Sequence, residues 1–465
     1  MSGSESFDAI IIGSGQAGKP LASELASAGW KTALIEREHV GGTCINVGCT
    51  PTKTMVASAR VAYLARRAGD YGVRVPGVAV DMAAVRARKR AMVERFRNYG
   101  TDRLQHTENL TLLFGRASFV DRSTVTVKLN DGGMRNLTAP KIGINSGGRP
   151  LVPSIAGLSS VPFLDSTSVM ELDTLPEHLI VLGGGSIGLE FGQMYRRFGA
   201  GVTIVERDAR LVAREDPDIS EAIRKILEQD GIRVDTQSAV ERVARDPATG
   251  EITVHYACEG CLRSVTGSHL LVAIGRRPNT EDLNLGAAGV ASDKAGYITV
   301  DATLQTSTPG IYALGDVKGG AAFTHVSYDD YRIVRDRWLK GLDARVGDRL
   351  IPNTTFIDPQ LGQVGLSTTE ARQRGLDIRV AKMDMNGVAR ALETDESRGM
   401  MKVIIDAKTD QILGCAVLGI EGGEIMSMLQ IAMMGKLPYT VLKEAIFAHP
   451  TLAEGLNNIF LALDS

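Results

Sequence analysis

The chain has 465 residues, 44% of them hydrophobic, which is enough for about three domains with buried cores. Its formal net charge is −2 at pH 7 and no run of like charges stands out, which argues against a nucleic acid or an anionic membrane as a partner. The polar start leads directly into a short apolar strand, so neither a signal peptide nor a membrane helix is predicted, and we expect a cytoplasmic protein. Five cysteines are too few for a disulfide framework, so a close pair indicates catalysis or metal binding.

The first motif is a strand-helix-strand unit at residues 7–38. An apolar strand leads into Gly13, Gly15 and Gly18, then an amphipathic helix and a second strand that ends at Glu36. The glycines permit a tight turn that brings the helix N-terminus to a pyrophosphate, and Glu36 can accept hydrogen bonds from a ribose. Because all four parts are present in order, the unit predicts a dinucleotide site.

A pair of cysteines follows this unit, in the sequence GGTCINVGCTPTK at residues 41–53. The four residues between Cys44 and Cys49 are few enough for the two sulfurs to bridge across one turn. Pro51 and the apolar stripe after it predict a helix, so Cys49 lies at or just before a helix N-terminus, where a thiolate is favoured. A thiolate there can attack a disulfide, bind a soft metal or donate charge to an electron-poor ring. A zinc site would need two further ligands nearby, and none follow; a structural disulfide is the other alternative.

The strand-helix-strand pattern returns at residues 178–211. Two such units imply two dinucleotides, the arrangement needed to move a hydride from a nicotinamide to a flavin. Glu206 favours an unphosphorylated ribose, whereas Arg207 and Arg210 could hold a 2′-phosphate or lie on a solvated turn, so NADH and NADPH both remain open. The residues expected to contact the nicotinamide dinucleotide are Gly183, Gly185, Ile187, Gly188, Glu206 and Arg207.

Two shorter apolar segments end in residues suited to a cofactor. The strand predicted from Leu270 ends at Gly275 and Arg276, and the segment GIYALGD ends at Asp316. An Asp at the C-terminal end of a strand lies where open α/β sheets bind ligands, and it can accept a sugar or ribityl hydroxyl.

Further motifs follow in order, namely INSGGRP, GGGSIGLE, GRRPNT, GIYALGD, FIDPQLGQVG and AHPTLAE. Together with GSGQAG and GGTCINVGCTPTK, these motifs make nearly the whole chain resemble the pyridine nucleotide-disulfide oxidoreductases, which include glutathione reductase, dihydrolipoamide dehydrogenase and mercuric reductase. The resemblance implies an α/β fold with two Rossmann-like domains, for FAD and NAD(P), and a C-terminal α+β dimerisation domain that makes a homodimer. The implied FAD domain has two parts, residues 1–148 and 273–348; the NAD(P) domain covers 149–272 and the interface domain 349–465.

The same resemblance assigns roles to single residues. Cys44 is similar to the interchange thiol that faces the substrate, and Cys49 to the charge-transfer thiol beneath the flavin, the two forming a redox-active disulfide. Lys53 and Glu190 match an ion pair beside flavin N5, where a cation stabilises the negative charge of the reduced ring. The remaining matches to cofactor-contacting positions are Gly42, Thr43, Lys53, Ala117, Ser146, Gly147, Gly275, Arg276, Asp316, Phe323 and Thr324.

A candidate acid-base pair lies near the C-terminus, where His449 precedes a proline and Glu454 follows five residues on. A histidine can take or give the proton that accompanies thiol-disulfide exchange, and a carboxylate on its other nitrogen raises its basicity. The resemblance implies that this dyad enters the active site of the opposite subunit.

Departures from the family pattern narrow the substrate. Mercuric reductases typically have a tyrosine in place of His449 and a C-terminal cysteine pair, yet no cysteine follows Cys415. Dihydrolipoamide dehydrogenases usually have a histidine at the position of Phe447. Residues 323–339 are instead similar to the branch that contains mercuric reductase-like proteins and the reactive-chlorine-resistance flavoprotein. That flavoprotein is described as reducing hypothiocyanous acid and, in some reports, Cu(II).

The leading hypothesis is therefore an NAD(P)H-dependent flavoprotein that reduces a small oxidised, thiol-reactive molecule such as hypothiocyanous acid. The alternatives are a reductase of Hg(II) or Cu(II), a dihydrolipoyl dehydrogenase or low-molecular-weight disulfide reductase, and a flavin redox sensor without turnover. The sensor needs no acid-base dyad, so the presence of His449 and Glu454 favours turnover.

Other sulfur-containing residues are given structural interpretations. Cys258 and Cys261 form a second Cys-x-x-Cys at a predicted hairpin, where they could form a disulfide, hold half a metal site with His255, or be incidental. Cys415 is expected on a buried strand. A run of methionines on one predicted helix is interpreted as packing and not as a copper site. We assign no metal site. These methionines are Met426, Met428, Met433 and Met434.

Overall fold

The structure is a computed structural model that describes residues 4–258, 260–347 and 349–463. The chain forms two compact units, each assembled from three segments. Unit 1 comprises residues 1–54, 86–151 and 275–349, and unit 2 comprises 55–85, 152–274 and 350–465. Helices α3 (Cys49–Arg66) and α4 (Met82–Gln105) contribute residues to both units. None of the helices in the described ranges combines the length and the apolar character that crossing a bilayer requires.

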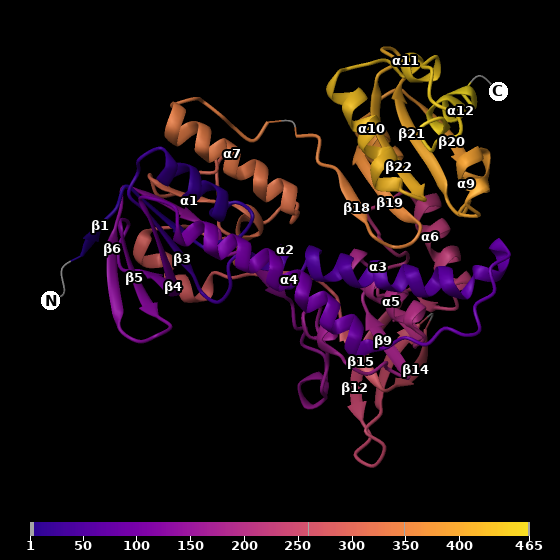
Figure 1. Cartoon of the computed structure of the whole chain (residues 1–465), viewed down its shortest axis with the longest axis horizontal. Helices are drawn as coiled ribbons and strands as arrows, with labels where there is room; N and C mark the ends of the chain where they lie inside the picture. Colours follow the sequence, from indigo (N-terminus) through magenta and orange to yellow (C-terminus); the bar gives the residue numbers. More distant parts are fainter. Residues whose placement is uncertain (1–3, 259, 348, 464–465) are drawn as a thin grey trace. The chain divides into compact units, whose positions relative to one another are not determined.

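Unit 1 is built on an eight-stranded sheet in the order β1-β6-β5-β4-β3-β2-β7-β17. Figure 1 labels the strands β1, β6, β5, β4 and β3 of this sheet. From β4 to β17 the neighbouring strands are parallel, and β4, β5 and β6 are antiparallel. A separate two-stranded ribbon pairs β8 with β16. The strands are β1 (Glu5–Ser6), β2 (Ala9–Ile12), β3 (Thr32–Glu36), β4 (Leu110–Phe119), β5 (Thr124–Leu129), β6 (Met134–Thr138), β7 (Lys141–Ile144), β8 (Gly148–Pro150), β16 (Arg276–Pro278) and β17 (Ile311–Ala313).

Helices cover the parallel part of this sheet, which explains why β2 and β3 are buried along their whole length. On one face α1 and α7 lie side by side (Figure 1), and Leu21, Leu25 and Val334 form part of one apolar cluster there. Trp30 stacks on Trp338, with ring centroids 6.4 Å apart. The helices of this unit are α1 (Gly18–Ser27), α2 (Gly42–Asn46) and α7 (Thr324–Lys340), with 3-10 turns at Glu281–Leu283, Leu285–Ala288 and Gly315–Lys318.

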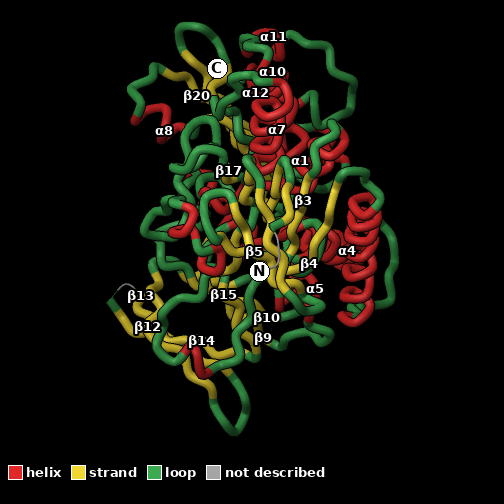
Figure 2. Tube along the Cα trace, turned by 90° about the vertical axis from the view of Figure 1, so that its left-hand side faces the viewer, coloured by secondary structure: helices red, strands yellow, loops and turns green. Residues whose placement is uncertain are grey.

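Unit 2 contains a parallel sheet in the order β11-β10-β9-β15 and an antiparallel sheet β12-β13-β14, which lie near each other in Figures 1 and 2. Helices α5 and α6 belong to the parallel sheet, and their apolar side chains join its core. The elements are β9 (His178–Leu182), β10 (Gly201–Val205), β11 (Arg233–Asp235), β12 (Ser238–Arg245), β13 (Ile252–Cys258), β14 (Cys261–Gly267), β15 (His269–Val272), α5 (Ser186–Phe198) and α6 (Pro217–Gln229), with 3-10 turns at Leu158–Ser160 and Ser168–Glu171.

The C-terminal part of unit 2 is a five-stranded antiparallel sheet in the order β18-β19-β22-β21-β20. Helix α10 packs its buried side chains on this sheet, including Met426, and Cys415 lies on the buried strand β22 as predicted. The elements are β18 (Asn353–Thr355), β19 (Gln360–Gly365), β20 (Ile378–Asp384), β21 (Met400–Asp406), β22 (Ile412–Gly419), α8 (Thr368–Gln373), α9 (Ala389–Glu393), α10 (Gly422–Met434), α11 (Tyr439–Lys443) and α12 (Gly455–Leu461), with a 3-10 turn at Met385–Gly387.

The fold class predicted from the sequence, an α/β protein with two parallel-sheet cores and a C-terminal α+β part, is confirmed. One strand differs from the prediction. Strand β15 ends at Val272, and Arg276–Pro278 form the separate strand β16, antiparallel to β8. The chain leaves unit 2 between these strands, and Gly275 has a φ of 143°, a conformation that glycine adopts without steric cost.

Candidate functional site

The two cysteines of the motif lie on the successive helices α2 and α3, in the part of the chain that belongs to unit 1. Cys44 is in α2, and α3 begins at Cys49, as the helix-start signal predicted. Both are free cysteines. The Cys49 sulfur lies 3.3 Å from the hydroxyl oxygen of Thr324, the first residue of α7. The motif therefore receives a contact from a residue 275 positions away in the chain.

The two thiols have opposite tendencies to ionise. A hydrogen bond from Cys44 lowers the pKa of the Cys49 thiol to about 6 against the effect of burial, and Thr324 and the charge of Lys53 lower it further. The same contact raises the pKa of Cys44, because that thiol gives its hydrogen to Cys49 and is itself desolvated. The contact thus favours a thiolate on Cys49 and a protonated thiol on Cys44.

Asn46, between the two cysteines, fixes the loop that precedes them. Its side-chain amide donates to the carbonyl oxygens of Val40 at 3.1 Å and Gly42 at 3.0 Å. The guanidinium of Arg97 on α4 donates to its Oδ1 at 2.8 Å. Sequence reasoning missed this role. The asparagine in a glycine-rich turn was a usable signal, but nothing local pointed to Arg97.

The glycines of the first dinucleotide unit leave no room for side chains. A Cβ atom at Gly13 would lie 2.3 Å from the Asn145 carbonyl oxygen, and one at Gly18 would lie 2.0 Å from the Gly13 carbonyl oxygen. Asn145 was not among the predicted residues. Its Oδ1 accepts a hydrogen bond from the Gly18 N–H at 2.9 Å, and its Nδ2 donates to the Leu314 carbonyl at 2.7 Å. It thereby ties the turn to β7 and to the end of β17.

The predicted ribose acceptor Glu36 also holds this turn. Its carboxylate accepts hydrogen bonds from the Ser14 N–H at 3.0 Å and the Ser14 hydroxyl at 2.6 Å, and it is buried. Each carboxylate oxygen can accept more than one hydrogen bond, so these contacts leave acceptor capacity for a ribose hydroxyl.

Other predicted FAD contacts of unit 1 fit a bound flavin nucleotide. The Ser146 hydroxyl is buried and has no hydrogen-bond partner among the residues that the structure describes. Burial raises the pKa of Asp316, and the guanidinium of Arg276 lies 4.0 Å from its carboxylate. A ligand hydroxyl would be a suitable hydrogen-bond partner for either group. Of the remaining predicted contacts, Gly15 and Gly42 approach each other closely, Thr43 lies in α2, Ala117 lies on β4, Gly147 has a φ of 68° and Phe323 caps α7.

The second dinucleotide unit, in unit 2, repeats this geometry. A Cβ atom at Gly183 would lie 2.5 Å from the Ala273 carbonyl oxygen, and one at Gly188 would lie 2.0 Å from the Gly183 carbonyl oxygen. No atom lies within 4 Å of a Cβ position at Gly185, so the start of α5 is open to a pyrophosphate in the described part of the chain. Ile187 packs against the core beside this turn.

The residues expected near the 2′ position of the ribose carry both negative and positive charges. The Glu206 carboxylate accepts hydrogen bonds from the Gly184 and Asp208 N–H groups. Arg207 is 80% exposed and pairs with Asp208 at 3.4 Å, and Arg210 is also exposed. A carboxylate and two exposed cations at one turn are compatible with NADH and with NADPH.

The predicted acid-base dyad forms a close pair within unit 2. His449 Nδ1 lies 3.0 and 2.9 Å from the two carboxylate oxygens of Glu454, just before α12. The His449 side chain is 67% exposed. Since the carboxylate occupies Nδ1, Nε2 is the ring nitrogen available for proton transfer.

Glu190, on α5, is buried and its Oε1 accepts a hydrogen bond from the Phe356 N–H at 2.9 Å. Lys53 lies on α3 within unit 1, one turn after Cys49, and its charge acts on the Cys49 thiol. The ion pair between Lys53 and Glu190 stays a prediction.

The second Cys-x-x-Cys lies at a hairpin, as predicted. Cys258 ends β13, Cys261 begins β14, and the two are direct cross-strand partners. Cys258 is buried and Cys261 is exposed; Glu259, between them, lies outside the described residues. No cluster of three or more potential metal-ligating side chains occurs in the described ranges.

Comparisons with known proteins cover nearly the whole chain. The sequence profile of the family "Pyridine nucleotide-disulphide oxidoreductase" matches residues 7–330, and that of its dimerisation domain matches residues 351–459. The chain is 37% identical over 458 residues to the probable pyridine nucleotide-disulfide oxidoreductase RclA of Escherichia coli, covering 98% of both chains. It is 35% identical over 463 residues to a mercuric reductase of Bacillus cereus, covering 99% of this chain and 72% of the relative.

Solved structures of one of these relatives also match the fold of the chain. The structure of the HOCl-induced flavoprotein disulfide reductase RclA from Escherichia coli matches with a TM-score of 0.88 at 37% identity, covering 98% of this chain and 99% of the other. A Cu(II) complex of the same reductase matches with a TM-score of 0.89 at 36% identity and the same coverage.

Proposed function

Because the chain belongs to the pyridine nucleotide-disulfide oxidoreductase family, we propose that it uses NAD(P)H to reduce a small oxidised, thiol-reactive molecule such as hypothiocyanous acid. The protein is an oxidoreductase that depends on FAD and NAD(P)H. The observation that carries the proposal is the asymmetry of the two thiols, with a thiolate favoured on Cys49 and a proton kept on Cys44.

Bound FAD would pass two electrons from NAD(P)H to a Cys44–Cys49 disulfide. The turns at Gly13 and Gly183 would hold the two pyrophosphates, with Ser146 and Asp316 taking hydroxyl groups of the flavin nucleotide. Thr324, at the start of α7, holds the Cys49 thiolate in place.

In the reaction with the substrate, the two thiols are oxidised to a disulfide and supply both electrons that reduce the substrate. His449 takes the proton of Cys44, whose sulfur attacks the sulfur of hypothiocyanous acid; an S–S bond forms, the S–O bond breaks, and the leaving hydroxide receives the proton as water. The Cys49 thiolate attacks the Cys44 sulfur, forming the Cys44–Cys49 disulfide and releasing thiocyanate. Glu454 on Nδ1 stabilises the histidinium between these two proton transfers.

A metal-ion reductase is the second candidate. Mercuric reductases are among the relatives, and a relative's structure is described as a Cu(II) complex. The soft Cys49 thiolate is a suitable ligand for either ion.

Steady-state oxidation of NADH and NADPH with hypothiocyanite, lipoamide, oxidised glutathione, Hg(II) and Cu(II) tests both candidates. We expect hypothiocyanite to give the highest kcat/KM, with loss of that activity in Cys44→Ser and Cys49→Ser. Cys261→Ser, an exposed cysteine elsewhere in the chain, is the matched control and should keep full activity. Absence of hypothiocyanite turnover in the flavin-loaded protein contradicts the proposal.

An anaerobic titration with NADH separates turnover from a sensor role. A reductase should form a long-wavelength thiolate-flavin band at two electrons per FAD, and Cys49→Ser should abolish this band. A wild-type protein that takes up two electrons without the band would rule out the assigned role of Cys49.

A further inference from the structure

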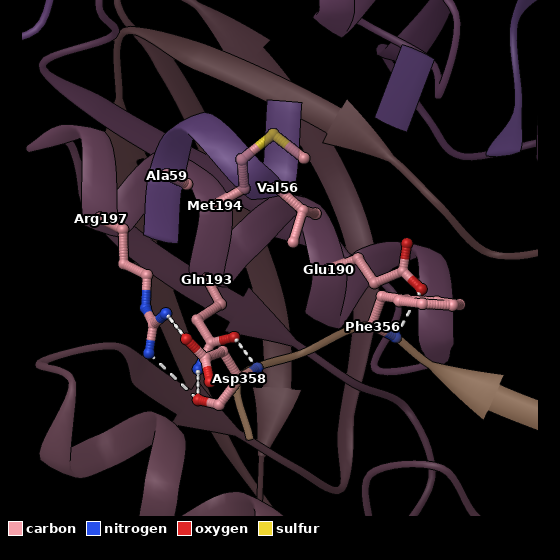
Figure 3. Close-up of a pocket in the computed structure, with 8 residues that line it drawn as sticks. All are labelled: Val56, Ala59, Glu190, Gln193, Met194, Arg197, Phe356 and Asp358. Atoms are coloured by element: carbon pink, nitrogen blue, oxygen red, sulfur yellow. Dashed lines mark hydrogen bonds and ion pairs between the residues drawn. The ribbon is translucent and has the colours of Figure 1, made fainter. Parts of the chain in front are cut away.

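Helix α5 presents three buried polar side chains on one face, at Glu190, Gln193 and Arg197, to the segment of residues 356–358 (Figure 3). Their spacing of three and four residues places them one above the other along the helix. They line a cavity of about 10 Å³, which is room for one water molecule. Most buried polar side chains have hydrogen-bond partners, so the contacts of this face are informative.

Gln193 and Arg197 hold the backbone of Asp358. The Gln193 amide donates to the Asp358 carbonyl oxygen at 2.8 Å, and its Oε1 accepts from the Asp358 N–H at 2.7 Å. The Arg197 guanidinium donates to the same carbonyl at 3.1 Å and forms an ion pair with the Asp358 carboxylate. Both peptide groups of Asp358 are therefore fixed to α5.

Two charged residues, Asp230 and Arg398, form further hydrogen bonds with Gln193 and Asp358. Asp230 accepts a hydrogen bond from Gln193 at 2.8 Å, and Arg398 donates to Asp230 at 2.6 Å and to the Asp358 carbonyl at 3.2 Å. Burial raises the pKa of Asp358, but the charges of Arg197 and Arg60 outweigh it and hold that pKa below its usual value. The carboxylate is thus ionised and paired, which makes the attachment stiff.

The third side chain of the face, Glu190, is oriented by the segment that Gln193 and Arg197 hold. Two residues before Asp358, the Phe356 N–H donates to Glu190 Oε1 at 2.9 Å. A peptide held at Asp358 restricts where the Phe356 N–H can point, and that N–H in turn selects one orientation of the Glu190 carboxylate.

We propose that Gln193 and Arg197 are positioning residues that orient Glu190 through the Phe356 N–H. This inference rests on the proposed function as an FAD-dependent reductase, and on the ion pair with Lys53 beside the flavin that the family resemblance implies for Glu190. If residues 356–358 loosen, the Glu190 carboxylate turns, the cation is less well placed, and the negative charge of the reduced ring is less stabilised. The flavin then becomes harder to reduce.

Gln193→Leu tests the inference, since leucine has a similar volume and removes both hydrogen bonds that residue 193 makes to the Asp358 backbone. We expect the reduced-to-oxidised flavin ratio at a fixed potential to fall roughly tenfold, about 30 mV in midpoint potential, measured against reference dyes. Met194→Leu, which lines the same cavity without polar contacts, is the matched control and should leave the potential unchanged.

A double variant separates positioning from general loosening. Glu190→Gln should lower the potential by itself, and adding Gln193→Leu to it should lower the potential no further, because the two changes act through one group. A wild-type potential in folded, flavin-loaded Gln193→Leu, or additive effects in the double variant, would overturn the inference. If Gln193→Leu fails to retain flavin, Arg197→Lys provides the same test, because it keeps the charge but cannot make both bonds to Asp358.

These readouts need no terminal substrate. Failure to reduce hypothiocyanite would therefore count against the proposed substrate and leave the positioning role standing. A wild-type potential in Glu190→Gln would instead remove the assigned role of Glu190, and the positioning role with it.

Discussion

The Thr324 hydroxyl is the residue-scale feature that most directly affects the proposed chemistry. It lies 3.3 Å from the Cys49 sulfur and lowers the pKa of that thiol, which is about 6. In Thr324→Val we expect a higher thiol pKa, because a hydrogen bond that favours the thiolate is lost. The thiolate-flavin band of the reduced protein should then titrate at a higher pH than in the wild type, as measured by absorbance against pH.

Thr324→Ser is the control for this titration, since serine keeps the hydroxyl and should keep the wild-type midpoint. Alkylation of Cys49 by iodoacetamide, followed against pH by mass spectrometry, gives a second measurement of the same pKa. Unchanged midpoints in Thr324→Val by both methods would show that the contact does not stabilise the thiolate.

Residues that act within one motif could be predicted, and residues that act across the chain could not. The position of Cys49 at a helix start followed from Pro51 and the apolar pattern behind it. The contact of Thr324 with Cys49 spans 275 residues and that of Asn145 with Gly18 spans 127, and no local pattern encodes either. Motif resemblance marked Thr324 as a cofactor contact but could not show its partner.

Among the secondary-structure elements, the turn between β2 and α1 needs a glycine at position 13 more for the close approach of Asn145 than for the positive φ of the backbone. Gly13 has a φ of 99°, and a Cβ atom there would lie 2.3 Å from the Asn145 carbonyl oxygen. Gly29 has a similar φ of 89°, but no described atom lies within 4 Å of its Cβ position. A side chain at Gly29 would therefore cause backbone strain only, whereas one at Gly13 would cause backbone strain and steric overlap.

We expect Gly29→Ala to cost about 1–2 kcal/mol of stability, the price of left-handed backbone in an alanine. Gly13→Ala should cost more than this and should also lower the flavin bound per chain, because β7 must shift away from the turn. Urea unfolding and the flavin-to-protein absorbance ratio measure both effects. Equal stability losses in the two variants would mean that the approach of Asn145 is not limiting.

The hairpin of β13 and β14 offers a second element-scale test. Cys258 and Cys261 are direct cross-strand partners, and antiparallel partners have Cα atoms about 4.5–5.5 Å apart, within the range of a disulfide. In a Cys44→Ser, Cys49→Ser background we expect diamide to oxidise this pair. The peptide that contains both residues should lose two hydrogen masses, and Cys261→Ser should prevent the loss. Full alkylation of both thiols after diamide would contradict the prediction.

For the whole molecule, the order of strands and helices was predictable because each nucleotide-binding unit is local in sequence. Both strand-helix-strand motifs form as expected, with β2, α1 and β3 in the first and β9, α5 and β10 in the second. The break between β15 and β16 was not predicted, because residues 270–274 form one apolar run, whereas β15 ends at Val272 and the chain then passes from unit 2 to unit 1.

The family's dimerisation domain matches residues 351–459, and part of its surface is apolar. Ile431 and Met434 on α10 are 69% and 67% exposed, and Ile446 is fully exposed. Exposed apolar side chains of this kind occur in surfaces that bind a partner. We therefore propose a homodimer in which His449 of each subunit serves the thiol pair of the other, as the family resemblance implies.

A heterodimer made from two inactive variants tests this arrangement directly. If one subunit carries Cys44→Ser and the other His449→Gln, one of the two sites combines an intact Cys44 with an intact His449 from across the interface. Co-expressed with different tags and purified through both, this dimer should recover about half of the wild-type turnover, because a symmetric dimer has two equivalent sites. Each variant homodimer should stay inactive at both sites. If His449 instead served its own subunit, each site of the heterodimer would contain one defect, and turnover would stay at the level of the single variants.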